Sequence, residues 1–145
     1  MNAGRVLLLG LFAVSVLATT SFTPRHNIHL NEDSLRFAEQ LIADGHFIAD
    51  KKGGWYKDEP SAEAENDFIR AHGVAEFAKW HLRIDDHHGE NSKGRSKFPF
   101  GDFKNVHRCA LIAIRSRARQ YGYSEIENAA AELQRKLEQK AKMPR

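Results

Sequence analysis

The chain has 145 residues, of which 41% are hydrophobic and 28% charged, and these proportions exclude a disordered, a collagen-like or a disulfide-stapled protein. Its length suits one domain, and its single cysteine, Cys109, excludes an intrachain disulfide and a zinc site built from several thiolates. The charge divides unevenly, because residues 1–92 hold nine Lys and Arg against fourteen Asp and Glu, whereas residues 93–145 hold thirteen against five.

The N-terminus carries a thirteen-residue apolar run, residues 6–18. This run is shorter than the roughly 20 residues of a membrane span and matches the hydrophobic region of a signal peptide. Residues 1–20 are therefore interpreted as a signal peptide cleaved after Ala18, or as an uncleaved N-terminal anchor. Both interpretations predict an exported protein (periplasmic or secreted) or one anchored by residues 6–18. If the start site is misassigned and translation begins later, the protein is cytoplasmic.

Residues 26–140 predict a single, mainly α-helical domain of about five helices, followed by a frayed tail at 141–145. Asn31 is a good N-cap for the first helix, which Gly45 ends. Pro60 opens the second helix and Gly73 ends it. A short third helix follows over residues 74–82.

One small β-hairpin is an option between the first two helices. There, Phe47–Ala49 and Trp55–Tyr56 flank a Gly-Gly turn. Residues 85–97 are polar and predict the longest loop. Asp102 then caps the longest helix, about 103–121. Ser124 opens the last helix with a capping box, and the short connection predicts a C-terminal antiparallel αα-hairpin.

The stretch Lys93–Phe103 reads KGRSKFPFGDF and is followed by Val106-His107-Arg108-Cys109. With these motifs the chain resembles a group of small bacterial proteins that share the pattern K-G-R-x-K-F-P-F/Y-G-D-F … V-H-R-C. Residues 116–122 are similar to the same group, in which an aromatic stands at the position of Ser96. The group has no known function, so the resemblance implies no activity.

Basic and aromatic side chains gather in the second half of the chain. Arg108, Arg115 and Arg119 recur at i, i+7 and i+11, which places them on one face of the predicted long helix. Arginine grips phosphate and aromatic rings stack on bases, so this face is a candidate binding surface. Alternatively, the arginines pair with the acidic first half and the aromatics fill the core. The candidate residues are Lys93, Arg95, Lys97, Phe98, Phe100, Arg108, Arg115 and Arg119.

Histidines provide the second set of candidates. On a helix continuing past residue 82, His81, Asp85 and His88 would share one face and offer metal ligands, although a solvated loop is the simpler interpretation. His107 and Cys109 stand two apart, which on a helix separates them by about 200° and prevents a nucleophile–base pair. Cys109 is predicted to be a buried structural thiol, and no catalytic residue or cofactor is assigned.

The sequence thus favours a small exported or membrane-tethered helical domain that works by binding rather than by catalysis. The expected partner is an anionic molecule or an acidic protein, with membrane contact only through the N-terminal segment. One alternative is a cytosolic basic protein that binds nucleic acid. The other is a small metal-dependent enzyme that uses the histidines.

Overall fold

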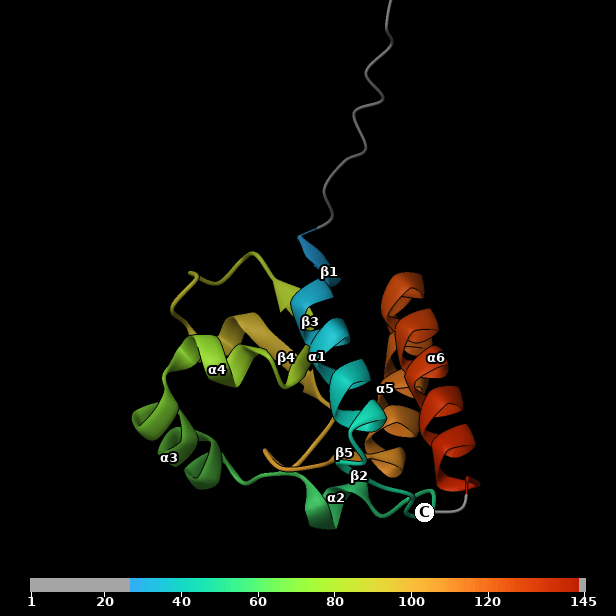
Figure 1. Ribbon diagram of the computed structural model, residues 1–145. Coiled ribbons are helices and arrows are strands. Elements are labelled where there is room, and N and C mark those ends of the chain that lie inside the picture. Colours follow the sequence, from blue (N-terminus) through green and yellow to red (C-terminus); the bar gives the residue numbers. More distant parts are fainter. Residues whose placement is uncertain (1–26, 144–145) are drawn as a thin grey trace, which may run out of the picture.

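The computed structural model describes residues 27–143 (Figure 1). The predicted signal peptide or anchor at residues 1–20 lies outside this range. Over the described residues, no helix combines the length and the apolar character needed to cross a membrane.

Six α-helices and five short strands make up the described residues, so the expectation of a mainly helical fold was wrong and the fold is mixed α/β. The helices are α1 (Glu32–Ala43), α2 (Trp55–Asp58), α3 (Ala62–His72), α4 (Val74–Ala78), α5 (Arg108–Tyr121) and α6 (Ser124–Ala141), with a 3-10 turn at Lys93–Arg95. The strands are β1 (Ile28–Leu30), β2 (Phe47–Ile48), β3 (His81–Asp85), β4 (Ser96–Pro99) and β5 (Val106–His107).

Three strands form an antiparallel sheet in the order β1-β3-β4. Ile28 lies opposite Asp85, and His81 lies opposite Pro99. The sequence predicted a helix over 74–82 and a loop over 85–97, but α4 ends at Ala78 and the chain then becomes the central strand. Residues 81–85 form a strand because they pair with a neighbouring strand on each side. Five residues are too few to show the alternating pattern of a strand in the sequence.

The other two strands, β2 and β5, pair in parallel and lie far apart in sequence. Phe47 aligns with Val106, and Ile48 aligns with His107. The predicted hairpin across the Gly-Gly turn was therefore wrong, since the residues after the turn begin α2 at Trp55 and do not form a strand that pairs with β2. This pairing sets the residues after β2 beside the start of α5.

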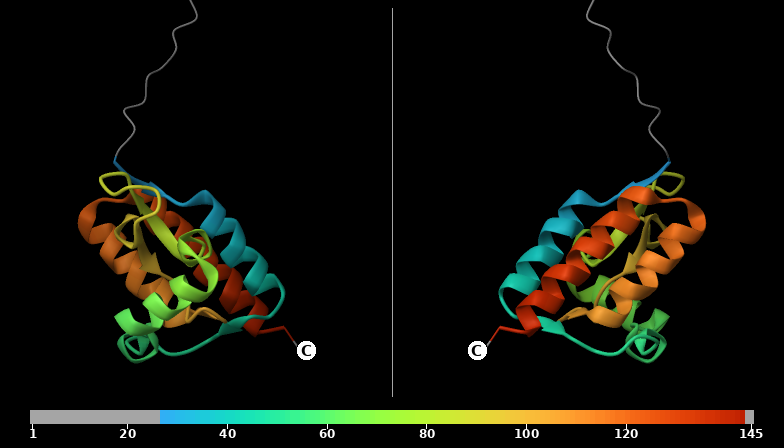
Figure 2. Two further views of the ribbon diagram at one scale, coloured as in Figure 1. Left: turned by 90° about the vertical axis from the view of Figure 1, so that its left-hand side faces the viewer. Right: turned by 90° about the vertical axis from the view of Figure 1, so that its right-hand side faces the viewer.

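Figure 2 shows α1, α6 and α5 side by side, with α6 in the middle, covering one face of the antiparallel sheet. Leu82 of the sheet, Leu111 of α5 and Leu133 of α6 are fully buried between these layers. The helices α5 and α6 run antiparallel, joined at Gly122, which has φ 73°. On the other side of the sheet, α3 and α4 project from the body of the molecule.

The start of α5 also differs from the prediction. The helix begins at Arg108, five residues later than expected, and Asp102 does not cap it. Asp102 instead accepts hydrogen bonds from the backbone N–H groups of Lys104 and Asn105 and so closes a turn. Within that turn Phe103 has φ 65°, a backbone conformation that no helix contains.

Candidate metal centre

Four side chains of metal-binding type meet where β2 and β5 lead into α2 and α5. They are Asp50, Asp58, His107 and Cys109, and their ligand atoms all lie within 4.8 Å of one another. Asp50 follows β2, Asp58 ends α2, and His107 and Cys109 flank the first residue of α5. Within residues 27–143 this is the one group of three or more such residues close enough to share an ion.

Asp50 is the centre of the group. Its Oδ2 lies 2.7 Å from Nδ1 of His107 and accepts a hydrogen bond from the thiol of Cys109 at 3.0 Å. Its Oδ1 accepts the backbone N–H of Cys109 at 2.7 Å. Because His107 makes no side-chain cap of its own, Asp50 serves as the N-cap of α5 from a distant segment. Burial raises the pKa of Asp50, but the hydrogen bonds from Cys109 and His107 outweigh it and hold this pKa below its ordinary value.

Cys109 is buried, with 1% of its surface exposed. Burial, followed by the hydrogen bond to Asp50 and the charges of Asp50 and Asp58, raises the pKa of its thiol to about 12. At neutral pH the free protein therefore holds a protonated sulfur, which is a poor nucleophile. A metal ion would displace that proton and stabilise the thiolate.

His107 is also buried, with 3% of its surface exposed. Its Nδ1 faces Asp50, whereas its Nε2 lies 3.2 Å from Oδ2 of Asp102. That second contact is close but poorly aligned, and Nε2 has no hydrogen-bond partner among the described residues. The ring also packs against Trp55, with centroids 5.5 Å apart. The buried imidazole thus lies between two carboxylates.

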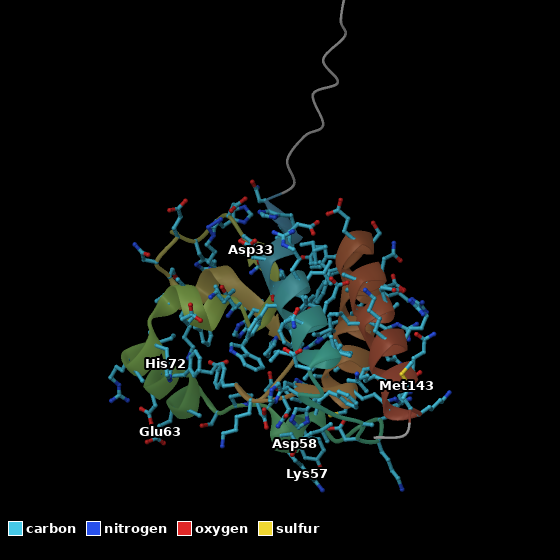
Figure 3. All side chains as sticks on the ribbon, viewed as in Figure 1. Asp33, Lys57, Asp58, Glu63, His72 and Met143 are labelled. Atoms are coloured by element: carbon cyan, nitrogen blue, oxygen red, sulfur yellow. The ribbon has the colours of Figure 1, made fainter. Side chains whose placement is uncertain are left out.

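Asp58 completes the group from the surface. Figure 3 shows it beside Lys57 at the edge of the molecule formed by α2. It is exposed, and no hydrogen bond from a described residue reaches its carboxylate. The buried ring of Trp55, on the same short helix, packs against Cys109 and Ala110 and fixes α2 beside α5. Asp58 thus offers an exposed carboxylate whose oxygen already lies within 4.8 Å of the other three ligand atoms.

The sequence predicted that His107 and Cys109 lie about 200° apart on one helix. The helix begins only after His107, whose backbone is extended at φ −102° and ψ 127°, so both side chains reach the same carboxylate. The role of Asp50 was missed entirely. It stands 57 residues before His107, and only the pairing of β2 with β5 brings the two together.

The metal ligands predicted from sequence occupy separate places. His81 is buried and its Nδ1 lies 2.8 Å from the carbonyl oxygen of Phe77. Asp85 pairs with Arg83 and His87 on the sheet. His88 lies in the following loop, and these candidates form no group with shared ligand geometry among the described residues.

Most of the predicted basic surface is engaged within the chain. Arg108 pairs with Glu138 at 2.6 Å, Arg119 pairs with Glu127 at 2.6 Å, and Arg115 donates to Gln134. These partners all lie on α6, in the same half of the chain, not in the acidic first half.

Two basic residues before α5 are also paired within the chain, but with acids of the first half. Lys93 pairs with Glu65 at 2.7 Å and Arg95 with Asp86 at 2.6 Å. Phe100 is fully buried, so it has no surface to offer, and Lys97 is exposed. Phe98 is half-buried beneath the guanidinium of Arg83. Binding of an anionic partner stays a prediction.

Comparison of the chain with protein-family models, with curated proteins and with solved structures finds no match. The fold and the site together define a small α/β protein with a candidate metal centre. The donor set, consisting of one thiol, one imidazole and two carboxylates, is the basis for a functional proposal.

Proposed function

We propose that the protein binds one divalent transition-metal ion of the zinc type through Asp50, Asp58, His107 and Cys109. The observation that carries this proposal is the gathering of four donor atoms within 4.8 Å from separate segments of the chain. Zinc takes thiolate, imidazole and carboxylate ligands together. Calcium and magnesium take oxygen ligands, so the sulfur and nitrogen donors disfavour both.

The donor positions suit a tetrahedral ion after small adjustments. Bonds of about 2.0–2.3 Å to a tetrahedral ion separate neighbouring ligand atoms by roughly 3.5 Å. The contacts of Asp50 with His107 and Cys109, at 2.7 and 3.0 Å, must therefore open slightly as an ion enters. Asp58 closes the fourth position from the solvent side. A centre with four protein ligands has no open position, and this favours a structural role over a catalytic one.

Metal binding would replace hydrogen bonds that now depend on protons. Cys109 would release its thiol proton to solvent, and a proton on Nδ1 of His107 would move to Nε2. Asp50 would exchange its hydrogen bonds with both side chains for a bond to the ion. The ion would then join the segment after β2 to the first turn of α5 more firmly than Asp50 does alone. On this proposal the protein is a metal-stabilised domain, in which the ion holds the segment after β2 and α2 against the start of α5.

Cobalt titration of the metal-free protein tests the proposal directly. Thiolate ligation gives an intense charge-transfer absorption in the near ultraviolet, and tetrahedral geometry gives strong visible bands. We expect one cobalt per chain, displaced by one zinc, with the stoichiometry confirmed by elemental mass spectrometry.

Two variants and one control sharpen this test. Cys109→Ser should abolish the charge-transfer absorption, and Asp58→Asn should weaken binding while leaving the metal-free fold intact. Asp44→Asn is the matched control, because Asp44 lies at the end of α1, outside the candidate centre, and its carboxylate accepts hydrogen bonds from Gln40. A wild-type protein that binds no cobalt or zinc, or a Cys109→Ser variant that keeps the absorption, would overturn the proposal.

A further inference from the structure

We infer that Asp102 is a positioning residue of this centre, holding His107 so that its Nδ1 faces the ion and its Nε2 carries the proton. This inference rests on the proposed metal site. It concerns a residue that binds no ion itself and acts through the imidazole. Three features of the turn between β4 and β5 carry it.

The first feature is that the two oxygens of the Asp102 carboxylate have different neighbours. Its Oδ1 accepts hydrogen bonds from the backbone N–H groups of Lys104 at 3.0 Å and Asn105 at 2.7 Å. The other oxygen, Oδ2, lies 3.2 Å from Nε2 of His107. One oxygen is thus held by the turn, and the other lies close to the imidazole without forming an aligned hydrogen bond.

The second feature is the tight backbone that makes this placement possible. A Cβ at Gly101 would lie 2.3 Å from the carbonyl oxygen of Asn105 and 2.8 Å from the ring of Trp80, so only glycine fits. Phe103 adopts φ 65°, which is unfavourable for a bulky residue. Its ring stacks on Phe68 at a centroid distance of 4.1 Å, which holds the turn in place.

The third feature is the unsatisfied nitrogen of His107. Nε2 is buried, close to the carboxylate of Asp102, and without a hydrogen-bond partner among the described residues. A neutral imidazole that binds a metal through Nδ1 must carry its proton on Nε2. A carboxylate beside that proton fixes the tautomer and raises the basicity of the ligand, an arrangement common in metal sites. A small rotation of His107 toward an ion would align its Nε2–H with Asp102.

Asp102→Asn is the decisive variant because it keeps one oxygen of the side chain and replaces the other with an amide nitrogen. The amide oxygen can still accept the hydrogen bonds of the turn, whereas an N–H₂ group replaces Oδ2 and faces Nε2 as a donor. This favours the tautomer with the proton on Nδ1, and a protonated Nδ1 cannot bind a metal ion. We expect zinc and cobalt affinity to fall by about 10- to 100-fold, while the melting temperature in chelator stays close to that of the wild type. Asp44→Asn again serves as the matched control.

The outcomes distinguish this inference from the proposal beneath it. If the wild type binds no metal, the proposed function fails. If the wild type and Asp102→Asn bind metal equally well, the role of Asp102 is overturned while the metal site stands. Should Asp102→Asn fail to fold, ¹⁵N NMR of the zinc-loaded wild type decides. Zinc on Nδ1 of His107 with a proton on Nε2 supports the inference, and the opposite assignment refutes it.

Discussion

Replacing Asp50 with alanine removes the carboxylate that is hydrogen-bonded to the side chains of both His107 and Cys109. The backbone N–H of Cys109 loses its cap, which costs about 1 kcal/mol with a range of about 0.5–2. Nδ1 of His107 is left buried without a partner, which costs about 1–3 kcal/mol more. We therefore expect Asp50→Ala to lower the free energy of unfolding by about 2–4 kcal/mol in the presence of a chelator.

Asp58→Ala is the contrasting variant. Its carboxylate is exposed and accepts no hydrogen bond from the described residues, so its loss in chelator should cost less than about 0.5 kcal/mol. Neither variant should gain as much stability from zinc as the wild type, because each lacks one of the four proposed ligands. At a free zinc concentration one hundred times the dissociation constant, only the wild type should gain about 2.7 kcal/mol.

Urea denaturation followed by tryptophan fluorescence, with chelator and with zinc, measures both quantities. An Asp50→Ala variant as stable as the wild type in chelator would refute the reasoning about the cap. An Asp58→Ala variant that loses as much stability as Asp50→Ala in chelator would show that Asp58 supports the fold itself and is not a free ligand.

Three further outcomes are expected. Burial lowers the pKa of His81 to about 4; the unfolded chain therefore protonates this residue first, and about 3 kcal/mol of stability should be lost as the pH falls from about 6.5 to 4. Urea denaturation across this range should show a flatter pH dependence for His81→Asn. Gly101→Ala should lower the melting temperature severely or abolish folding, because its Cβ would lie 2.3 Å from a backbone oxygen. Alkylation of Cys109 at pH 8, followed by mass spectrometry, should be slow in the metal-free folded protein and fast in urea, since the buried thiol has a pKa of about 12; fast labelling of the folded protein would contradict this.

Several helix ends were predictable from local signals, although the capping box expected at Ser124 was wrong, because Tyr123 is the N-cap of α6 and makes no side-chain cap hydrogen bond. The side chain of Asn31 does accept the N–H of Ser34 and caps α1. Gly45 and Gly122 follow α1 and α5 with positive φ, as a C-terminal glycine stop requires. Such signals depend on a few neighbouring residues, and a single sequence contains them in full.

The strands and the site depend on distant parts of the chain. Asp102 is of a residue type that commonly caps helices. The positive φ of Phe103 and the bridge between Gly101 and Val106, however, turn the chain before the helix begins. Strands of two to five residues are too short to show an alternating pattern. Asp50 looks like an ordinary loop aspartate, since nothing near it in sequence indicates its contact with Cys109.

The parallel pairing of β2 with β5 also determines when the centre can form during protein synthesis. Asp50 leaves the ribosome 57 residues before His107, so neither the strand pair nor the donor set exists until the intervening chain has been made. Closing a loop of that length costs entropy that a two-residue strand pair hardly offsets. A chain that stops before Cys109 would contain three of the four donors and still lack the thiolate and the α5 turn. Capture of the ion by all four ligands would therefore require a chain that extends past Cys109 into α5.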